Sequence, residues 1–209
     1  MKQIKVIFTL FLISLFILFC SCNTLKKVGE DTKNILEIRN LKYKISNLSN
    51  VMISNISLSN KKSISDISMA EGLRLVNDFS KKNIIADFFI NVEIFNPNDG
   101  SPGFRNSIVT LTRLDWQLFI DDKPTISGGI EAPVEVPSGK KHSIIVLKAS
   151  LNLFQFFGDW EYEDLIKLAF IIAGKGGSER IKLLATPTLT TSQGQVKAPK
   201  VTIIDSEFR

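Results

Sequence analysis

The sequence is poor in the side chains that most enzymes use. Its 209 residues include one histidine and two cysteines, and both cysteines, Cys20 and Cys22, fall within the first 22 residues. A single histidine excludes a His-rich metal site and a pair of histidines for acid–base catalysis. The rest of the chain has no cysteine, so we expect neither a disulfide nor thiol chemistry there.

The remaining candidates for catalysis or metal binding have simpler interpretations. His142 follows two lysines in an expected turn, where we predict a solvated side chain, and no Gly-x-Ser-x-Gly elbow is present to supply a nucleophile. Asp121-Asp122 suits a turn, and Asp159 with Asp164 suits a helix start. We therefore predict no enzymatic activity, no metal and no cofactor.

Long blocks of one charge are also missing. The net charge is +5, and without Lys2 and Lys5 the chain has 24 basic and 21 acidic side chains. The lysines come as dispersed pairs, such as Lys61-Lys62 and Lys81-Lys82. Such pairs are typical of a solvated surface, so we expect no nucleic-acid partner.

The first 22 residues have the layout of a bacterial export signal. Lys2 and Lys5 form a basic start, and residues 6–19 are apolar apart from Thr9 and Ser14. This run is shorter than the roughly 20 residues that a membrane span needs. We therefore expect residues 1–21 to be a signal peptide, with an uncleaved signal anchor as the alternative.

The end of this run, Phe19-Cys20-Ser21-Cys22, resembles the lipobox of bacterial lipoproteins. In such signals a small residue precedes the cysteine that is lipidated and becomes the new amino terminus. Ser21 fits the small position, so Cys22 is the predicted lipidation site, whereas the bulky Phe19 makes Cys20 a poorer acceptor. Residues 22–34 are then the lipidated cysteine and a polar tether to the membrane.

Residues 35–209 are predicted to form one domain, organised around a strand that ends at a proline corner. From Asp87 to Phe95 one set of alternate positions is fully apolar, namely Phe88, Ile90, Val92 and Ile94. Side chains alternate between faces along a strand, so this set marks a buried face. The strand stops at Asn96-Pro97-Asn98, where proline cannot donate to a ladder and the asparagines are expected to bond to backbone. Outward Phe89 and Phe95 favour an apolar contact surface, or a face that a helix covers.

The same alternation predicts further strands. The clearest are residues 114–120, where Trp116 and Leu118 share the apolar face, and residues 143–153. Residues 38–46 and 51–58 are two expected strands, and the apolar set of the second shifts by one position, as at a bulge or at a crossing between sheets. Gly128-Gly129 is interpreted as a bulge, because it lacks the strand–loop–helix context of a phosphate site. Residues 180–190 and 195–204 complete a final hairpin.

Two helices are expected among these strands. Ser68 and Glu71 form a capping box for a helix over residues 69–79, in which Met69, Leu73 and Val76 share one face. The second helix is expected to be capped by Asp159 and closed by Gly174, and it is apolar nearly all round. Strands separated by turns, with two inserted helices, predict an antiparallel β-sandwich.

Three of these features together resemble the type-2 late-embryogenesis-abundant family, also called the water-stress and hypersensitive-response (WHy) domain. They are the strand ending in Asn96-Pro97-Asn98, the strand–turn–strand unit from residue 114 to residue 128, and the strand after Val136-Pro137-Ser138. A closing helix and strand pair match residues 160–173 and 180–205. The resemblance implies a mainly β fold, an antiparallel immunoglobulin- or fibronectin-III-like β-sandwich, without catalytic residues or cofactor.

The lipobox and the resemblance together define the expected function. Relatives with a lipobox are membrane-tethered, plant relatives are linked to stress tolerance, and some anchored relatives are suspected of binding lipid. We expect a non-enzymatic lipoprotein of the bacterial cell envelope, in the outer membrane if the cell is Gram-negative, that binds a lipid or an envelope protein or has a stress-protective role. The alternative is a carrier of lipid or another hydrophobic ligand, with a cavity between the sheets lined by Phe88, Ile90, Trp116 and Leu118.

Overall fold

The computed structural model describes residues 41–102, 106–139, 141–175, 180–191, 194–204 and 208. The chain divides into two units, Met1–Arg39 and Asn40–Arg209. The predicted signal peptide, Cys22 and the tether lie outside the described residues, so their assignments stay predictions. No helix in the described part of the chain is long and apolar enough to cross a membrane.

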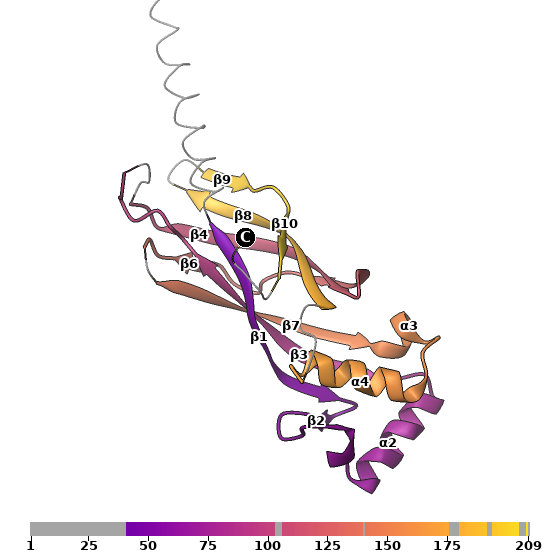
Figure 1. Cartoon of the computed structure of the whole chain (residues 1–209). Helices are drawn as coiled ribbons and strands as arrows, with labels where there is room; N and C mark the ends of the chain where they lie inside the picture. Colours follow the sequence, from indigo (N-terminus) through magenta and orange to yellow (C-terminus); the bar gives the residue numbers. More distant parts are fainter. Residues whose placement is uncertain are drawn as a thin grey trace, which may run out of the picture. The chain divides into compact units, whose positions relative to one another are not determined.

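The described unit is a sandwich of two antiparallel β-sheets (Figure 1). In the first sheet the strand order is β2-β1-β3-β7, and in the second it is β10-β8-β4-β5, with β6 pairing β4 and β9 pairing β8. This is the strand order of a fibronectin type III sandwich, so the expected fold class is confirmed. The strands are β1 (Lys42–Ile53), β2 (Ile56–Ser57), β3 (Ile85–Phe95), β4 (Val109–Ile120), β5 (Lys123–Gly128), β6 (Val134–Val136), β7 (His142–Asn152), β8 (Ile181–Thr191), β9 (Gly194–Lys197) and β10 (Val201–Ile203).

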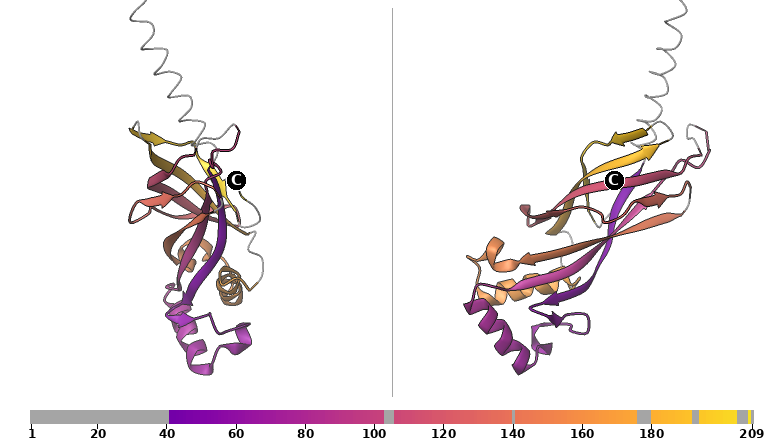
Figure 2. Two further views of the ribbon diagram at one scale, coloured as in Figure 1. Left: turned by 90° about the vertical axis from the view of Figure 1, so that its left-hand side faces the viewer. Right: turned by 180° about the vertical axis from the view of Figure 1, so that it is seen from behind.

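The core lies between the sheets and continues under a helix. The predicted apolar set of β3 is buried, since Phe88 is 2% exposed and Ile90, Val92 and Ile94 are 0% exposed. Figure 2 shows that the first sheet extends beyond the end of the second, where the helices gather. There α4 (Tyr162–Ile172) contacts β1. Because six of its eleven residues are buried, α4 takes the place of the second sheet as the cover of this part of the core.

The described residues contain three α-helices rather than the expected two. They are α2 (Met69–Ser80), α3 (Leu153–Phe157) and α4, and a 3-10 turn, η1 (Ile64–Asp66), precedes α2. The unexpected α3 begins where the Asn152 side chain accepts a hydrogen bond from Phe154 N, at 3.0 Å. Since α3 and the turn after it take up residues 153–160, the N-cap of α4 is Glu161, and the prediction of Asp159 as the cap was wrong.

The face of α2 that Met69, Leu73 and Val76 share points to solvent. Their exposed fractions are 85%, 67% and 53%, whereas Leu75 is fully buried. The capping box of Ser68 and Glu71 is present as predicted. The helix packs instead through Leu75 and Phe79, whose ring lies edge-on to Phe154 and Tyr162. The side of α2 that carries Met69, Leu73 and Val76 is therefore uncovered by the described residues.

The shift in the apolar pattern of residues 51–58 has a different cause from the two expected. Ser54 and Asn55 both have positive φ angles, 48° and 62°, and Ile53 pairs with Ile56. This is a two-residue hairpin turn, in which both central residues adopt left-handed conformations. The turn, and not a bulge or a crossing, reverses the chain between β1 and β2. Two register shifts do occur in the pairing of β1 with β3, but earlier in β1.

Candidate binding surface on the outer face of the long sheet

The outer face of the sheet formed by β1, β3 and β7 carries apolar side chains among polar ones. Ile144 and Val146 of β7 are each 58% exposed, and Met52 of β1 is 36% exposed. Phe89 and Phe95 of β3 are half-buried on the same face. Large exposed apolar side chains on one surface mark a possible contact site. The prediction that Phe89 and Phe95 face outward is thus confirmed.

One end of this face is closed by an aromatic cluster. The ring of Phe208, near the C-terminus, lies 6.2 Å from that of Phe95 and 5.2 Å from that of His142. Lys44 places its ammonium 5.4 Å from the centre of the Phe208 ring, a cation–π arrangement. His142 is therefore part of a surface aromatic contact, and its Nδ1 lies 3.6 Å from the Glu93 carboxylate. It is the first residue of β7 rather than a turn residue.

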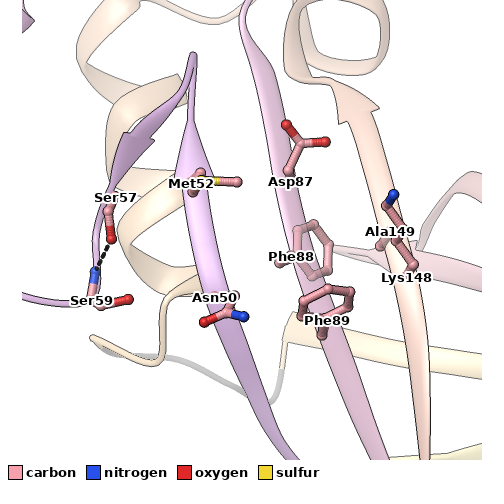
Figure 3. A pocket seen from close by; sticks show the side chains of 9 residues that line it. All are labelled: Asn50, Met52, Ser57, Ser59, Asp87, Phe88, Phe89, Lys148 and Ala149. Atoms are coloured by element: carbon pink, nitrogen blue, oxygen red, sulfur yellow. Dashed lines mark hydrogen bonds between the residues drawn. The ribbon is translucent and has the colours of Figure 1, made fainter.

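The other end of the face is open and forms a groove of about 430 Å³ (Figure 3). Met52 and Phe89 supply its apolar surface, and Asp87 and Lys148 stand on neighbouring strands. Phe88 and Ala149 belong to the buried set, so they reach the groove from beneath the sheet surface. We call this site the face groove. Its lining residues are Asn50, Met52, Ser57, Ser59, Asp87, Phe88, Phe89, Lys148 and Ala149.

The polar groups of the face groove differ in their bonding. Ser59 N donates to Ser57 Oγ at 3.4 Å, which fixes the loop after β2 at the edge of the groove. Within the part of the chain that the structure describes, the Lys148 ammonium makes no ion pair. The face groove therefore offers an apolar floor, the Asp87 carboxylate and, at Lys148, an available cation. The Lys148 side suits an apolar group carrying a carboxylate or phosphate.

A second groove lies between β7 and β5, the edge strands of the two sheets. It has a volume of about 380 Å³, and we call it the flank groove. The Trp116 indole, 4% exposed, lies at its base against Gly128, where an added Cβ would be 2.5 Å from the ring. The indole Nε1 is buried and has no hydrogen-bond partner in the described structure. The flank groove is lined by Trp116, Ile126, Ser127, Gly128, Gly129, Glu131, Val146, Lys148 and Ser150.

The four residues of the predicted ligand cavity are not gathered in either groove. Phe88 lines the face groove and Trp116 lines the flank groove. Ile90 and Leu118 are 0% exposed and line neither of them. All four side chains are core residues, as the alternation predicted, but a cavity shared by them stays a prediction.

The Asn-Pro-Asn corner has the structural role that the sequence indicated. Asn96 is 0% exposed and Asn98 is 1% exposed. Asn96 Nδ2 donates to Ser107 O at 2.8 Å and to Val136 O at 3.3 Å, and Asn96 Oδ1 accepts from Asn98 N at 3.1 Å and from Asn98 Nδ2 at 2.7 Å. Together with Pro97 this network joins the end of β3 to the start of β4 and to β6. Three of the four bonds are to backbone groups, as the sequence predicted for the asparagines.

Three of the four carboxylates singled out in the sequence, Asp121, Asp122 and Asp164, lie against side chains of opposite charge. Asp121 and Asp122 form the predicted turn, with φ angles of 51° and 60°. Asp121 pairs with Arg180, which raises the pKa of the guanidinium, and Asp122 lies 2.6 Å from Lys182. Asp164 lies 3.2 Å from Lys167 of the same helix. Among the described residues no three His, Cys, Asp or Glu side chains come together as a metal site.

Comparisons with known proteins add little to this description. No family model matches the sequence, and no curated protein sequence matches it. Among solved structures, the chain is similar to a protein from Archaeoglobus fulgidus (12% identity over 60% of this chain and 82% of that chain, TM-score 0.34) and to structural genomics target SoR45 (7% identity over 80% and 89%, TM-score 0.38). It is also similar to the ApaA protein from Bordetella pertussis, with 10% identity over 78% and 98% and a TM-score of 0.31. These TM-scores are too low to support an argument about function.

Proposed function

We propose that this protein is a non-enzymatic lipoprotein of the bacterial cell envelope, held at the membrane by a lipid on Cys22. Its sandwich domain binds a lipid or an envelope protein through the outer face of the β1-β3-β7 sheet. The observation that supports this proposal best is the face groove, with an apolar floor, an available ammonium and a volume of about 430 Å³. The family resemblance adds a role in stress protection to the same proposal.

The surface is suited to binding because it is preformed. β3 and β7 pair over eleven consecutive positions without a register shift, and the buried side of β3 is packed in the core. Phe89 is therefore held on a rigid sheet and loses little conformational freedom when a ligand covers it. The partner that fits has an apolar group for Phe89 and Met52 and an anionic group for Lys148. A phospholipid and an acidic protein segment both satisfy this description.

Lipidation is tested in a bacterial host by labelling with palmitate. Cys22→Ala should accumulate as the unprocessed precursor and take up no label, whereas Cys20→Ala should be processed and labelled normally. An acyl chain contributes about 0.8 kcal/mol per buried methylene to membrane retention. The Cys22→Ala protein should therefore also differ from wild type in its distribution among the cell fractions. Normal labelling of Cys22→Ala, or loss of labelling in Cys20→Ala alone, would refute Cys22 as the site.

Binding is tested in the bacterium that makes the protein, with a photoreactive phenylalanine analogue at position 89. The matched control is position 119, because Phe119 is also half-buried but belongs to the other sheet. We expect a discrete crosslinked product from position 89 that is weakened by Lys148→Glu. Protease sensitivity or extraction into organic solvent then distinguishes a protein partner from a lipid. Absence of a product at position 89, or equal products at both positions, would contradict the proposal.

A further inference from the structure

One long and regular strand edge has no partner strand among the described residues, although β5 and β6 lie close to it. Among the described residues, β2 has two residues, β10 has three, β5 contains Pro124 beside an irregular pairing, and β1 has two register shifts. Short length, proline and bulges are the devices by which proteins protect sheet edges from pairing. β7 has eleven residues, no proline and an unbroken register, and β3 is its one partner strand in the described structure. Two features match protective devices, namely the charge of Lys148 near its middle and the nearness of β5 and β6, which leave the flank groove as the accessible part of the edge.

An unpaired strand edge can form hydrogen bonds with the backbone of another polypeptide segment. In an antiparallel ladder, alternate residues of the edge strand direct both N–H and C=O away from the neighbouring strand. Along β7 this creates a row of donors and acceptors that an extended chain matches group for group. A lipid or a small molecule does not offer such a repeating pattern. Addition of a strand to an exposed edge is a recurring mode of peptide recognition.

The flank groove supplies the space and the side-chain contacts for such a chain. Its β7 wall is formed by alternate residues, Val146, Lys148 and Ser150, and its other wall is β5 with Glu131. The β5 wall limits the occupant, because a second copy of this domain would bring its own second sheet against that wall. A single extended chain needs less space. Trp116 and Gly128 line the base of the groove, where the nearly buried indole packs against the glycine, so a residue of the added chain can lie beside them.

We propose that β7 binds an extended segment of a partner protein, which adds a strand to the first sheet along the flank groove. The segment places a small apolar residue over Gly128 and Trp116, and an acidic residue near Lys148. The flank groove adjoins the face groove and shares Lys148 with it, but this inference does not depend on the lipid anchor or on the identity of the partner there. The two proposals are tested separately through residues that line one groove alone, Phe89 in the face groove and Val146 in the flank groove.

The test joins a model strand to the protein itself. The Phe208 ring lies 5.2 Å from that of His142, the first residue of β7, so a segment joined after residue 209 has a short distance to span from Phe208 to this strand. We would append a glycine–serine linker of about 20 residues, with a root-mean-square reach of about 25 Å, and a nine-residue segment of alternating valine and threonine with a central aspartate. Tethering gives an effective concentration in the millimolar range, so weak pairing becomes measurable.

The readout is amide hydrogen exchange of the full chain in detergent, with and without the extension. We expect alternate amides of residues 144–150 to exchange about tenfold more slowly in the extended protein. Protection of this size is expected when the dissociation constant of the tethered segment is about tenfold lower than its effective concentration. The same extension with proline at alternate positions should give no protection, because proline cannot donate to a ladder. Unchanged exchange, or equal protection by the proline version, would overturn the proposal.

Two variants of β7 separate pairing along the flank groove from a general effect on the strand. Val146 and Ile144 are equally exposed, at 58%, but only Val146 lines the flank groove. Val146→Lys should abolish the protection by placing a charge where the added chain lies, while Ile144→Lys should retain it. The reverse pattern would overturn the inference. Concentration-dependent protection of β7 in the protein without the extension would also overturn it, in favour of pairing between two copies.

Discussion

Replacement of Asn96 by alanine tests the corner that joins β3 to β4. The asparagine is 0% exposed, and its amide makes four hydrogen bonds, two as donor and two as acceptor. Three of them involve backbone groups, namely Ser107 O, Val136 O and Asn98 N. The Asn96→Ala protein loses all four bonds at once, and the shortened side chain leaves no polar atom in their place.

The expected cost follows from the number of groups affected. A buried group that loses its partner costs about 1 to 3 kcal/mol, and carbonyl oxygens tolerate the loss better than N–H groups. With partial compensation by water, the total is about 3 to 5 kcal/mol of the free energy of unfolding. Domains are stable by about 5 to 15 kcal/mol, so the variant should lose a large part of its stability. Pro97→Ala at the same corner should cost about 1 kcal/mol or less, through added freedom of the unfolded chain.

Urea denaturation of the chain from residue 23 onward, followed by tryptophan fluorescence, measures these differences. The matched control is Asn91→Ala, because Asn91 also donates to two side chains, at 2.9 and 3.0 Å, but on the half-buried outer face. Its loss should be about 1 kcal/mol. An Asn96→Ala protein within about 1 kcal/mol of wild type, or equal to Asn91→Ala, would refute the structural role of the corner.

Three further predictions concern the core and the helices. Trp116→Ala should lower the free energy of unfolding by about 3 to 5 kcal/mol, because the buried indole fills the space over Gly128, and a urea melt near wild type would show that it is not part of the core. Leu75→Ala should cost about 2 to 5 kcal/mol and Leu73→Ala less than about 0.5 kcal/mol, so equal losses would contradict the orientation of α2. Hydrogen bonds from Lys61 and Ser68 lower the pKa of Glu71 to about 2, so its stabilisation is present above pH 4.5 and is lost as the pH falls toward 2. Glu71→Gln should therefore show a smaller loss of stability over this pH range, and identical slopes for both proteins would contradict the assignment.

The parts of the fold that the sequence predicted are those set by local alternation. In β3 the predicted and observed buried residues agree, because a strand that packs on one side leaves a period of two in its own residues. Trp116 faces the core for the same reason. The corner at Asn96 was also predictable, since proline and asparagine at the end of a strand have few other uses. The sequence signal for α3 is Asn152 before an apolar run, because the asparagine side chain caps the helix.

The candidate site could not be derived in this way, because its residues meet only through strand pairing. Met52 faces Asp87 across β1 and β3, and Phe89 faces Lys148 across β3 and β7, so the face groove depends on sheet order and register. The helix α2 shows a related difficulty. Its apolar arc includes Leu75 as well as Leu73, and periodicity alone does not select which part is buried. Tertiary packing selected the side of Leu75.

The position of the face groove on β1 has a mechanical consequence. The described chain begins at the residue before β1, and Met52 of the face groove lies near the opposite end of that strand. If the protein is tethered before β1 and holds a partner on Phe89, as proposed, a pull between the two would act along the length of β1 and β3. Because β1 and β3 are antiparallel, this force loads the hydrogen bonds between them together, in shear, instead of opening them one after another. A protein anchored to the membrane at one end of β1 and bound to a partner at the other end would therefore resist mechanical extension. It would stay attached to the membrane and to the partner.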